Sequence, residues 1–121
     1  MKEIRAYIQP FMLSKVTQAL QKIPGFPALS VMEIRGFGRG KVLAPGDKLV
    51  REFVPKIRLE TVVKDELVEE VVQTIARAAH TGNLGDGIIF VVNVEQAVRI
   101  RTGERDIAAI RSMKNEKTDL D

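Results

Sequence analysis

The chain has 121 residues, 45% of them hydrophobic, which predicts one compact domain with a sizeable core. Because it contains no cysteine and a single histidine, disulfides, thiolate catalysis and cysteine-ligated metals are excluded, and a self-contained zinc site is not expected. Its net charge of +3 comes from 19 basic and 16 acidic residues that are interspersed, and only one tyrosine and five phenylalanines are aromatic, so we expect no nucleic-acid binding.

The first residues predict a strand rather than a targeting signal. The chain starts without the apolar core of a secretion signal, and it has no run of about 18 apolar residues, so we expect a cytoplasmic protein with no membrane insertion. Alternating apolar residues over 4–8 favour a strand, and the helical spacing over 13–23 predicts a helix. This helix is expected to start near Pro10 and to end at Pro24-Gly25, before an extended segment over 29–37.

The second half repeats the order of strand, helix and strand. Residues 57–63 and 88–94 predict strands, and apolar spacing over 67–79 predicts a helix with Asp65 as its N-cap. Two such units predict an α+β fold, a ferredoxin-like double βαβ sandwich with a four-stranded antiparallel sheet and both helices on one face. We expect this domain to cover residues 1–110.

The sheet face away from the helices is expected to mix charges with long alkyl stems. Its expected members are Arg5, Tyr7, Glu33, Arg35, Arg58 and Glu60. The segment 88–92 is apolar on both faces, which favours a strand buried on two sides and hence a subunit interface behind the sheet. A monomer with a solvated sheet face is the alternative.

A long connection, residues 38–52, joins the two halves. It has no clear period, and Pro45-Gly46-Asp47 forms a turn near its tip. Its charged residues are Arg39, Lys41, Lys48 and Arg51, with Asp47 and Glu52. A structureless connection of about 15 residues in a compact domain is usually functional or disordered, so a partner-binding loop and a slack linker are both open. At the other end, Ile107 and Ile110 predict one helical turn before a polar tail over 111–121.

Three glycines, Gly82, Gly85 and Gly87, separate the second helix from the last strand. Glycine reaches positive φ freely, so such a loop can turn several backbone N–H groups toward one anion. Since the loop follows a helix, the helix end repels phosphate, and cations must come from elsewhere. Arg99 and Arg101 are the candidates, because in an extended segment both project from one face. Alternatively, the glycines form only a tight turn and the arginines are solvated.

Several segments together resemble the PII family of nitrogen-regulatory signal-transduction proteins. They are Ile8-Gln9-Pro10-Phe11, Glu33-Ile34-Arg35-Gly36-Phe37-Gly38-Arg39, Phe53-Val54-Pro55-Lys56, residues 81–90, and Arg99-Ile100-Arg101-Thr102-Gly103-Glu104. The resemblance implies a homotrimer of ferredoxin-like subunits with ATP or ADP in each cleft between subunits. It also implies that residues 38–52 form a protruding loop that regulates a transporter, an enzyme or a transcription factor. Some details are similar to a divergent PII group associated with heavy-metal efflux transporters.

Carried over by position, the resemblance implies a nucleotide site shared by two subunits. Residues expected to edge the nucleotide are Gly36, Phe37, Gly38 and Arg39, those expected to cradle its phosphates are Gly85, Asp86 and Gly87, and those expected to line the cleft are Val62 and Phe90. Residues expected to reach in from the neighbouring subunit are Ser30, Arg99 and Arg101. Lys56 matches the lysine that pairs with 2-oxoglutarate. Residues expected to contact the partner are Arg39, Lys41, Asp47, Lys48 and Arg51.

The sequence departs from the family pattern in three places. Gly40 stands where the family usually has the glutamine that helps to bind Mg²⁺ and 2-oxoglutarate, which weakens the case for both ligands. Ile88 stands where a phosphate-binding lysine is usual, so ADP or AMP is expected to compete better with ATP. Residues 38–52 contain no serine, threonine or tyrosine, so modification of a loop hydroxyl is excluded.

The leading hypothesis is therefore a non-enzymatic trimeric regulator that binds adenine nucleotide and controls a partner through residues 38–52. One alternative, motivated by Gly40 and Ile88, is a nucleotide-independent trimeric adaptor. Another is a slow ATPase in which three carboxylates position water, although no general base or set of Mg²⁺ ligands is evident. Those carboxylates are Asp86, Glu60 and Glu33.

Overall fold

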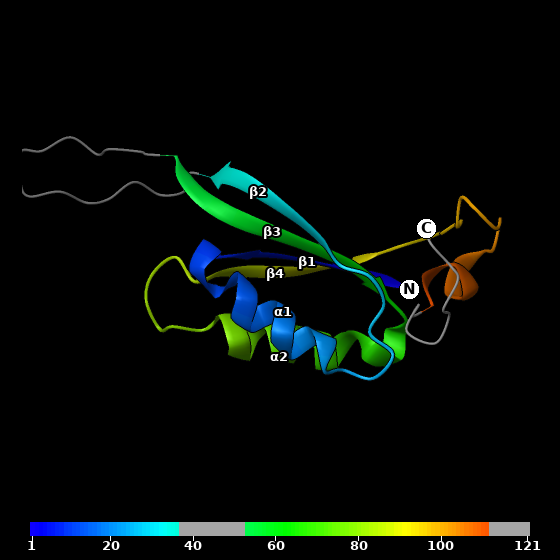
Figure 1. Ribbon diagram of the computed structural model, residues 1–121, viewed down its shortest axis with the longest axis horizontal. Helices are drawn as coiled ribbons and strands as arrows, with labels where there is room; N and C mark the ends of the chain where they lie inside the picture. The colour runs from blue at the N-terminus through cyan, green and yellow to red at the C-terminus, as the bar shows by residue number, and fades with distance from the viewer. Residues whose placement is uncertain (37–52, 112–121) are drawn as a thin grey trace, which may run out of the picture.

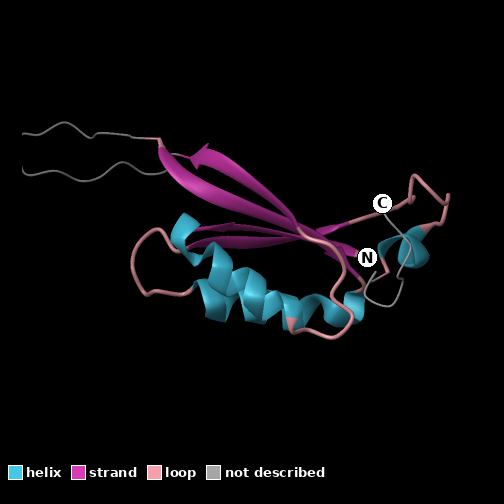
Figure 2. Ribbon diagram, viewed as in Figure 1, coloured by secondary structure: helices cyan, strands magenta, loops and turns pink. Residues whose placement is uncertain are grey.

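The computed structural model describes residues 1–36 and 53–111, and it has two layers, a sheet and a pair of helices (Figure 1). The sheet consists of β1 (Lys2–Ile8), β2 (Ser30–Gly36), β3 (Val54–Val63) and β4 (Gly87–Asn93) in the order β2-β3-β1-β4, with all neighbours antiparallel. The helices α1 (Leu13–Gln21) and α2 (Val68–Ala79) pack together on one face of this sheet (Figure 2). The predicted α+β ferredoxin-like sandwich is confirmed.

The core lies between the two central strands and the helices. Alternate residues of these strands are almost fully buried, namely Ile4, Ala6 and Ile8 of β1 and Ile57, Leu59 and Val63 of β3. The helices cover them with Val16 and Leu20 of α1 and Val71 and Ile75 of α2. Each of the larger side chains contributes about 1.5–3 kcal/mol by leaving water. The alternation in the strands and the helical spacing seen in the sequence therefore mark the same core.

Both helices start through a 3₁₀ turn, η1 (Pro10–Met12) before α1 and η2 (Asp65–Leu67) before α2. The prediction that Asp65 caps the second helix is wrong, because Lys64 occupies the N-cap position and Asp65 lies inside the first turn. The Oδ1 atom of Asp65 instead accepts a hydrogen bond from the N-terminal amine of Met1 at 2.9 Å. The hydrogen bond from this amine, then its positive charge, and to a smaller extent the charge of Lys2 lower the pKa of the Asp65 carboxyl.

The register of β2 corrects the predicted composition of the bare sheet face. Directly opposed residues of an antiparallel pair point to the same face, and Glu33 lies opposite Ile57, which belongs to the core. Glu33, and with it Arg35, therefore lies on the helix side of β2. The bare face of β2 carries Met32, which lies opposite Arg58. The sequence alone did not reveal this, because β2 is an edge strand without a clear apolar alternation.

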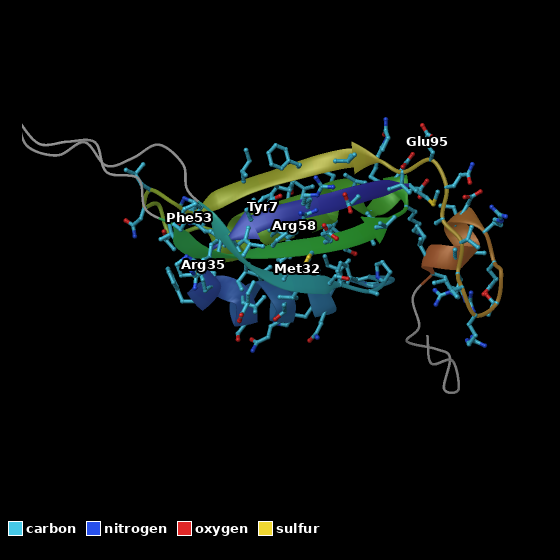
Figure 3. All side chains as sticks on the ribbon, turned by 90° about the horizontal axis from the view of Figure 1, so that it is seen from above. Tyr7, Met32, Arg35, Phe53, Arg58 and Glu95 are labelled. Atoms are coloured by element: carbon cyan, nitrogen blue, oxygen red, sulfur yellow. The ribbon has the colours of Figure 1, made fainter. Side chains whose placement is uncertain are left out.

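The rest of the bare face agrees with the prediction. Tyr7 and Arg58 lie together on it (Figure 3), with the Arg58 guanidinium carbon 5.9 Å from the centre of the Tyr7 ring. Arg5 and Arg58 both pair with the Glu60 carboxylate. Beside them runs the edge strand β4, whose residues Ile88, Phe90, Val91 and Val92 are 40–54% exposed in this single chain. These apolar side chains of β4 are therefore only partly covered by the described residues.

Candidate functional site

Most of the predicted site residues that the structure describes form two groups, one at each end of the sheet shown in Figures 1 and 2. The glycine end comprises Gly36, Lys56 and residues 85–87, and the arginine end comprises Ser30, Val62, Arg99 and Arg101. The seven residues of β4 separate the two ends, since Gly87 pairs with Ile8 and Asn93 pairs with Lys2. At the rise of an extended strand the ends are roughly 20 Å apart. Two groups at this separation cannot surround the same phosphate group within one chain.

At the glycine end, the predicted positive φ values are confirmed. They are 89° at Gly82, 93° at Gly85 and 115° at Gly87. A Cβ added at Gly87 would lie 1.7 Å from the carbonyl oxygen of Tyr7, because the start of β4 approaches the backbone of β1. A Cβ at Gly85 would lie 2.8 Å from the Gln9 amide nitrogen. The positive φ values favour glycine at all three positions, and at Gly87 close packing against the β1 backbone requires it as well.

The carboxylate of Asp86 stabilises the glycine loop through hydrogen bonds within the loop. Its carboxylate accepts hydrogen bonds from the backbone N–H groups of Thr81 (2.8 Å) and Gly82 (2.9 Å), and also from the Thr81 hydroxyl. These hydrogen bonds, with that of the Thr81 hydroxyl as the largest cause, hold the pKa of Asp86 below its ordinary value. Two N–H groups that could face an anion thus already face this carboxylate. The part of Asp86 in cradling a phosphate stays a prediction.

Lys56 brings a cation to the glycine loop. Its Nζ donates a hydrogen bond to the carbonyl oxygen of Gly85 at 2.6 Å. The same side chain borders a cavity of about 430 Å³ that Glu33, Arg35 and neighbouring apolar residues also line. Gly36, the last residue of β2, lies at this end of the sheet opposite Val54. The structure thus brings Gly36, Lys56 and the glycine loop to one end.

The arginine end contains a larger cavity of about 680 Å³. All four predicted residues of this end line it, Ser30, Val62, Arg99 and Arg101. Val62 therefore lies with the arginines and not with the glycine loop. Glu60, considered above as a water-positioning carboxylate, also lines it, whereas sequence reasoning missed further lining residues, among them Glu3, Thr61, Ile110 and Arg111. Strand alternation could have found Glu3, because it places Glu3 on the bare face with Arg5 and Glu60.

The arginines do not lie on an extended segment, so that prediction is wrong. The backbone N–H of Arg99 donates to Glu104 (2.9 Å), and the N–H of Gly103 donates to the carbonyl of Arg99 (2.8 Å), which closes a tight turn. A φ of 75° at Gly103 permits this turn. Arg99 Nη2 donates to the carbonyl oxygen of Ala109 at 2.7 Å, in the short helix η3 (Asp106–Ile110). This helix confirms the helical turn predicted around Ile107 and Ile110.

Phe90 lies apart from both groups, in the middle of β4 opposite Arg5. Its ring meets that of Tyr7 edge to face, with 6.2 Å between the ring centres. Other predicted site residues lie outside the described residues, namely Phe37, Gly38, Arg39, Lys41, Asp47, Lys48 and Arg51. The expected loop over 38–52 also lies outside them, as does the tail beyond Arg111.

The fold is that of a ferredoxin-like subunit, with the two groups of predicted site residues at opposite ends of its sheet. The family model described as "Nitrogen regulatory protein P-II" matches residues 1–104. A "Nitrogen regulatory protein P-II" of Bradyrhizobium diazoefficiens is 48% identical over 113 residues, which cover 91% of this chain and 100% of the relative. "Nitrogen regulatory protein P-II 1" of Escherichia coli K12 is 47% identical with the same coverage.

The chain therefore belongs to the PII family, as its motifs predicted. PII proteins are signal-transduction regulators and not enzymes, and a homotrimer is consistent with the family. Within the described residues, the helices are too short or too polar to cross a membrane. The relation to the group associated with heavy-metal efflux transporters stays a prediction.

Proposed function

We propose that this protein is a non-enzymatic trimeric regulator that binds an adenine nucleotide in clefts between its subunits. A partner protein, such as a transporter or an enzyme, would respond to the bound nucleotide through residues 38–52. The observation that carries this proposal is the separation of the glycine end from the arginine end. Ser30, Arg99 and Arg101 line one cavity, whereas the glycine loop lies at the opposite end of the sheet. A complete site then needs the arginine end of one subunit against the glycine end of the next.

Head-to-tail contacts of this kind use two different surfaces and close into a ring when the rotation allows it. The bare sheet face supports such an assembly. Buried Nε atoms of Arg5 and Arg58 have no hydrogen-bond partner among the described residues, and Ile88 and Phe90 are about half exposed. Buried polar atoms in native proteins are usually paired, so a second copy that covers this face explains both features.

The ligand chemistry follows from the charges at the two ends. Arg99 and Arg101 supply guanidinium groups, which suit phosphate oxygens, and Lys56 supplies an ammonium group at the glycine loop. Ile88 offers no charge to a terminal phosphate, so we expect ADP and AMP to bind with affinities near that of ATP. The three carboxylates considered for a slow ATPase do not share a cavity among those described here. Glu60 lines the larger cavity, whereas Glu33 and Asp86 lie toward the glycine end.

Mixed trimers test the shared site directly. Arg101→Ala removes a cation from the arginine end, and Gly85→Ala strains the glycine loop, so each variant alone should lose nucleotide binding in titration calorimetry. When the two variants are co-assembled, one kind of interface pairs an intact arginine end with an intact glycine end. Part of the wild-type binding should then return. Arg77→Ala, at an exposed position of α2, is the control and should bind as the wild type does.

Two outcomes would contradict the proposal. A wild-type trimer that binds none of ATP, ADP or AMP at millimolar concentration would favour the nucleotide-independent adaptor. Binding by the wild type that mixed trimers never restore, although light scattering shows them to be assembled, would place the site within one chain. Adding Mg²⁺ or 2-oxoglutarate to the same titrations tests both ligands, and the substitution at Gly40 leads us to expect little effect from either.

A further inference from the structure

Two arginines connect η3 with the turn that carries Arg99 and Arg101. Arg99 donates from the turn to η3, and Arg111 donates from the end of η3 to the turn. Arg99 Nη2 donates from the turn to the carbonyl oxygen of Ala109 in η3. Arg111 Nη1, just after η3, donates back to the Glu104 carboxylate at 2.5 Å and to the carbonyl oxygen of Ala108 at 3.0 Å. Hydrogen bonds between ionised groups are about twice as strong as neutral ones. Arg111 therefore holds both the end of η3 and the end of the turn.

Glu104 is the only acidic residue of the turn, and its position matters for an anion site. Its Oε1 accepts hydrogen bonds from the Thr102 hydroxyl at 2.8 Å and from Arg111. Its backbone carbonyl binds the N–H of Arg99, so the carboxylate lies close to that arginine in the chain and in space. A carboxylate that lost Arg111 would turn to the nearest remaining cation. It would then compete with a phosphate for the arginines of the cavity.

Arg111 lies outside the part of the chain that the family pattern covers. The family model ends at residue 104, whereas Arg111 lines the same cavity of about 680 Å³ as Arg99 and Arg101. The acids Glu3 and Glu60, which also line this cavity, already pair with Arg5 and Arg58 on the bare face. Arg111 pairs with Glu104. The side chains of this ion pair are both about one-third exposed, so the pair is accessible to solvent and to a ligand.

We propose that Arg111 is a positioning residue of the anion pocket. It binds Glu104 and the end of η3, fixes the turn from Arg99 to Glu104, and engages the Glu104 carboxylate in an ion pair, so that this carboxylate competes less with a phosphate for the two pocket arginines. The ligand class is a phosphate-bearing molecule, and the inference rests on the nucleotide site of the proposed function.

Titration calorimetry with ADP tests this role in full-length trimers. Arg111→Ala should raise the dissociation constant about tenfold, the size expected when one charge-assisted contact is lost. Arg105→Ala is the matched control, because it removes the same charge at an exposed position whose part in the turn is a backbone pairing with Val98. Its dissociation constant should stay within about twofold of the wild type, as for most exposed positions. The dissociation constant of Arg111→Lys should lie between those of the wild type and Arg111→Ala, since lysine keeps the charge but cannot reproduce the two hydrogen bonds of the guanidinium.

The double variant separates positioning from a merely structural role. Adding Glu104→Gln to Arg111→Ala removes the uncompensated carboxylate, so the double variant should bind ADP more tightly than Arg111→Ala alone. If the pair only stabilised the turn, the second substitution would weaken binding further. The inference is overturned if the wild type binds ADP and Arg111→Ala matches Arg105→Ala, or if the double variant shows no recovery. A wild type that binds no nucleotide overturns the proposed function itself, which distinguishes the two failures.

Discussion

At the glycine end the backbone determines the local structure, whereas at the arginine end side chains from several segments do. Gly87 is needed because β4 starts against the backbone of β1, and Asp86 holds the loop through main-chain N–H groups. The arginine end draws on both central strands, on β2, on the turn from Arg99 to Glu104 and on η3. Substitutions in the glycine loop should therefore lower the free energy of unfolding most, whereas substitutions at the arginine end should cost less stability and act mainly on ligand affinity.

The largest effect is expected from Gly87→Ala. The new Cβ would overlap the carbonyl oxygen of Tyr7, and the backbone at φ 115° is unfavourable for any residue with a Cβ, so we expect a loss of about 3 kcal/mol or more in the free energy of unfolding. Gly36→Ala is the control, since its Cβ would meet no described atom within 4 Å. Urea unfolding measures both. Equal stability of the two variants would contradict a backbone-defined glycine end.

A smaller effect is expected at the wall of the arginine end from Thr61→Val. Thr61 is buried and its hydroxyl donates to the carbonyl oxygen of Ala28 at 2.7 Å, so the substitution leaves that carbonyl unpaired and should cost about 1–2 kcal/mol in the free energy of unfolding. Thr17→Val is the matched control, because the Thr17 hydroxyl makes a similar bond to Ser14 in an exposed place. If both variants unfold at the same urea concentration, the bond to Ala28 does not matter.

The smallest effect should be the response to acid, to which Asp86 at the glycine end and Glu104 at the arginine end contribute beside Asp65. The hydroxyl of Thr81 lowers the pKa of Asp86, and the guanidinium of Arg111 lowers the pKa of Glu104. Because each folded pKa lies below the unfolded one, each contribution to stability is complete above the ordinary pKa and is lost as pH falls through the folded pKa. Stability should therefore decline below about pH 4.

Two variants, Asp86→Asn and Glu104→Gln, show which end of the sheet causes the decline in stability at low pH. In each variant the free energy of unfolding, measured with urea across this pH range, should decrease less with falling pH than in the wild type. Hydrogen exchange adds the location, because Asp86→Asn should speed exchange of the Thr81 and Gly82 amides and leave Gly103 unchanged. A decline identical in the wild type and in both variants would mean that other carboxylates cause it.

The sequence predicted the parts of the molecule that depend on local patterns. Alternation predicted β1 and helical spacing predicted both helices, because their buried positions repeat with the period of the element, and the other strands were predicted as extended or apolar segments. The glycine loop was predictable for a similar reason, since only glycine takes up the required φ values without strain. The motifs also indicated the family, which the comparisons confirmed over residues 1–104.

The predictions were wrong where contacts outside the local pattern decide the position of a residue. Asp65 pairs with the chain's own N-terminus instead of capping a helix, and the face of Glu33 depends on the register of β2 against β3. The arginine turn is held by η3, which follows it in the chain. None of these contacts repeats along the sequence, so no local pattern could reveal them.

By itself, the sequence determined the elements, the core, the positive-φ glycines and the family. The tertiary structure alone decided which site residues lie together: Val62 with the arginines, Lys56 with the glycine loop, and Arg111 with Glu104. The physical reason is that element type follows from interactions between neighbours along the chain. A site instead depends on how strands pair and where their ends meet, which is fixed only when the whole sheet forms.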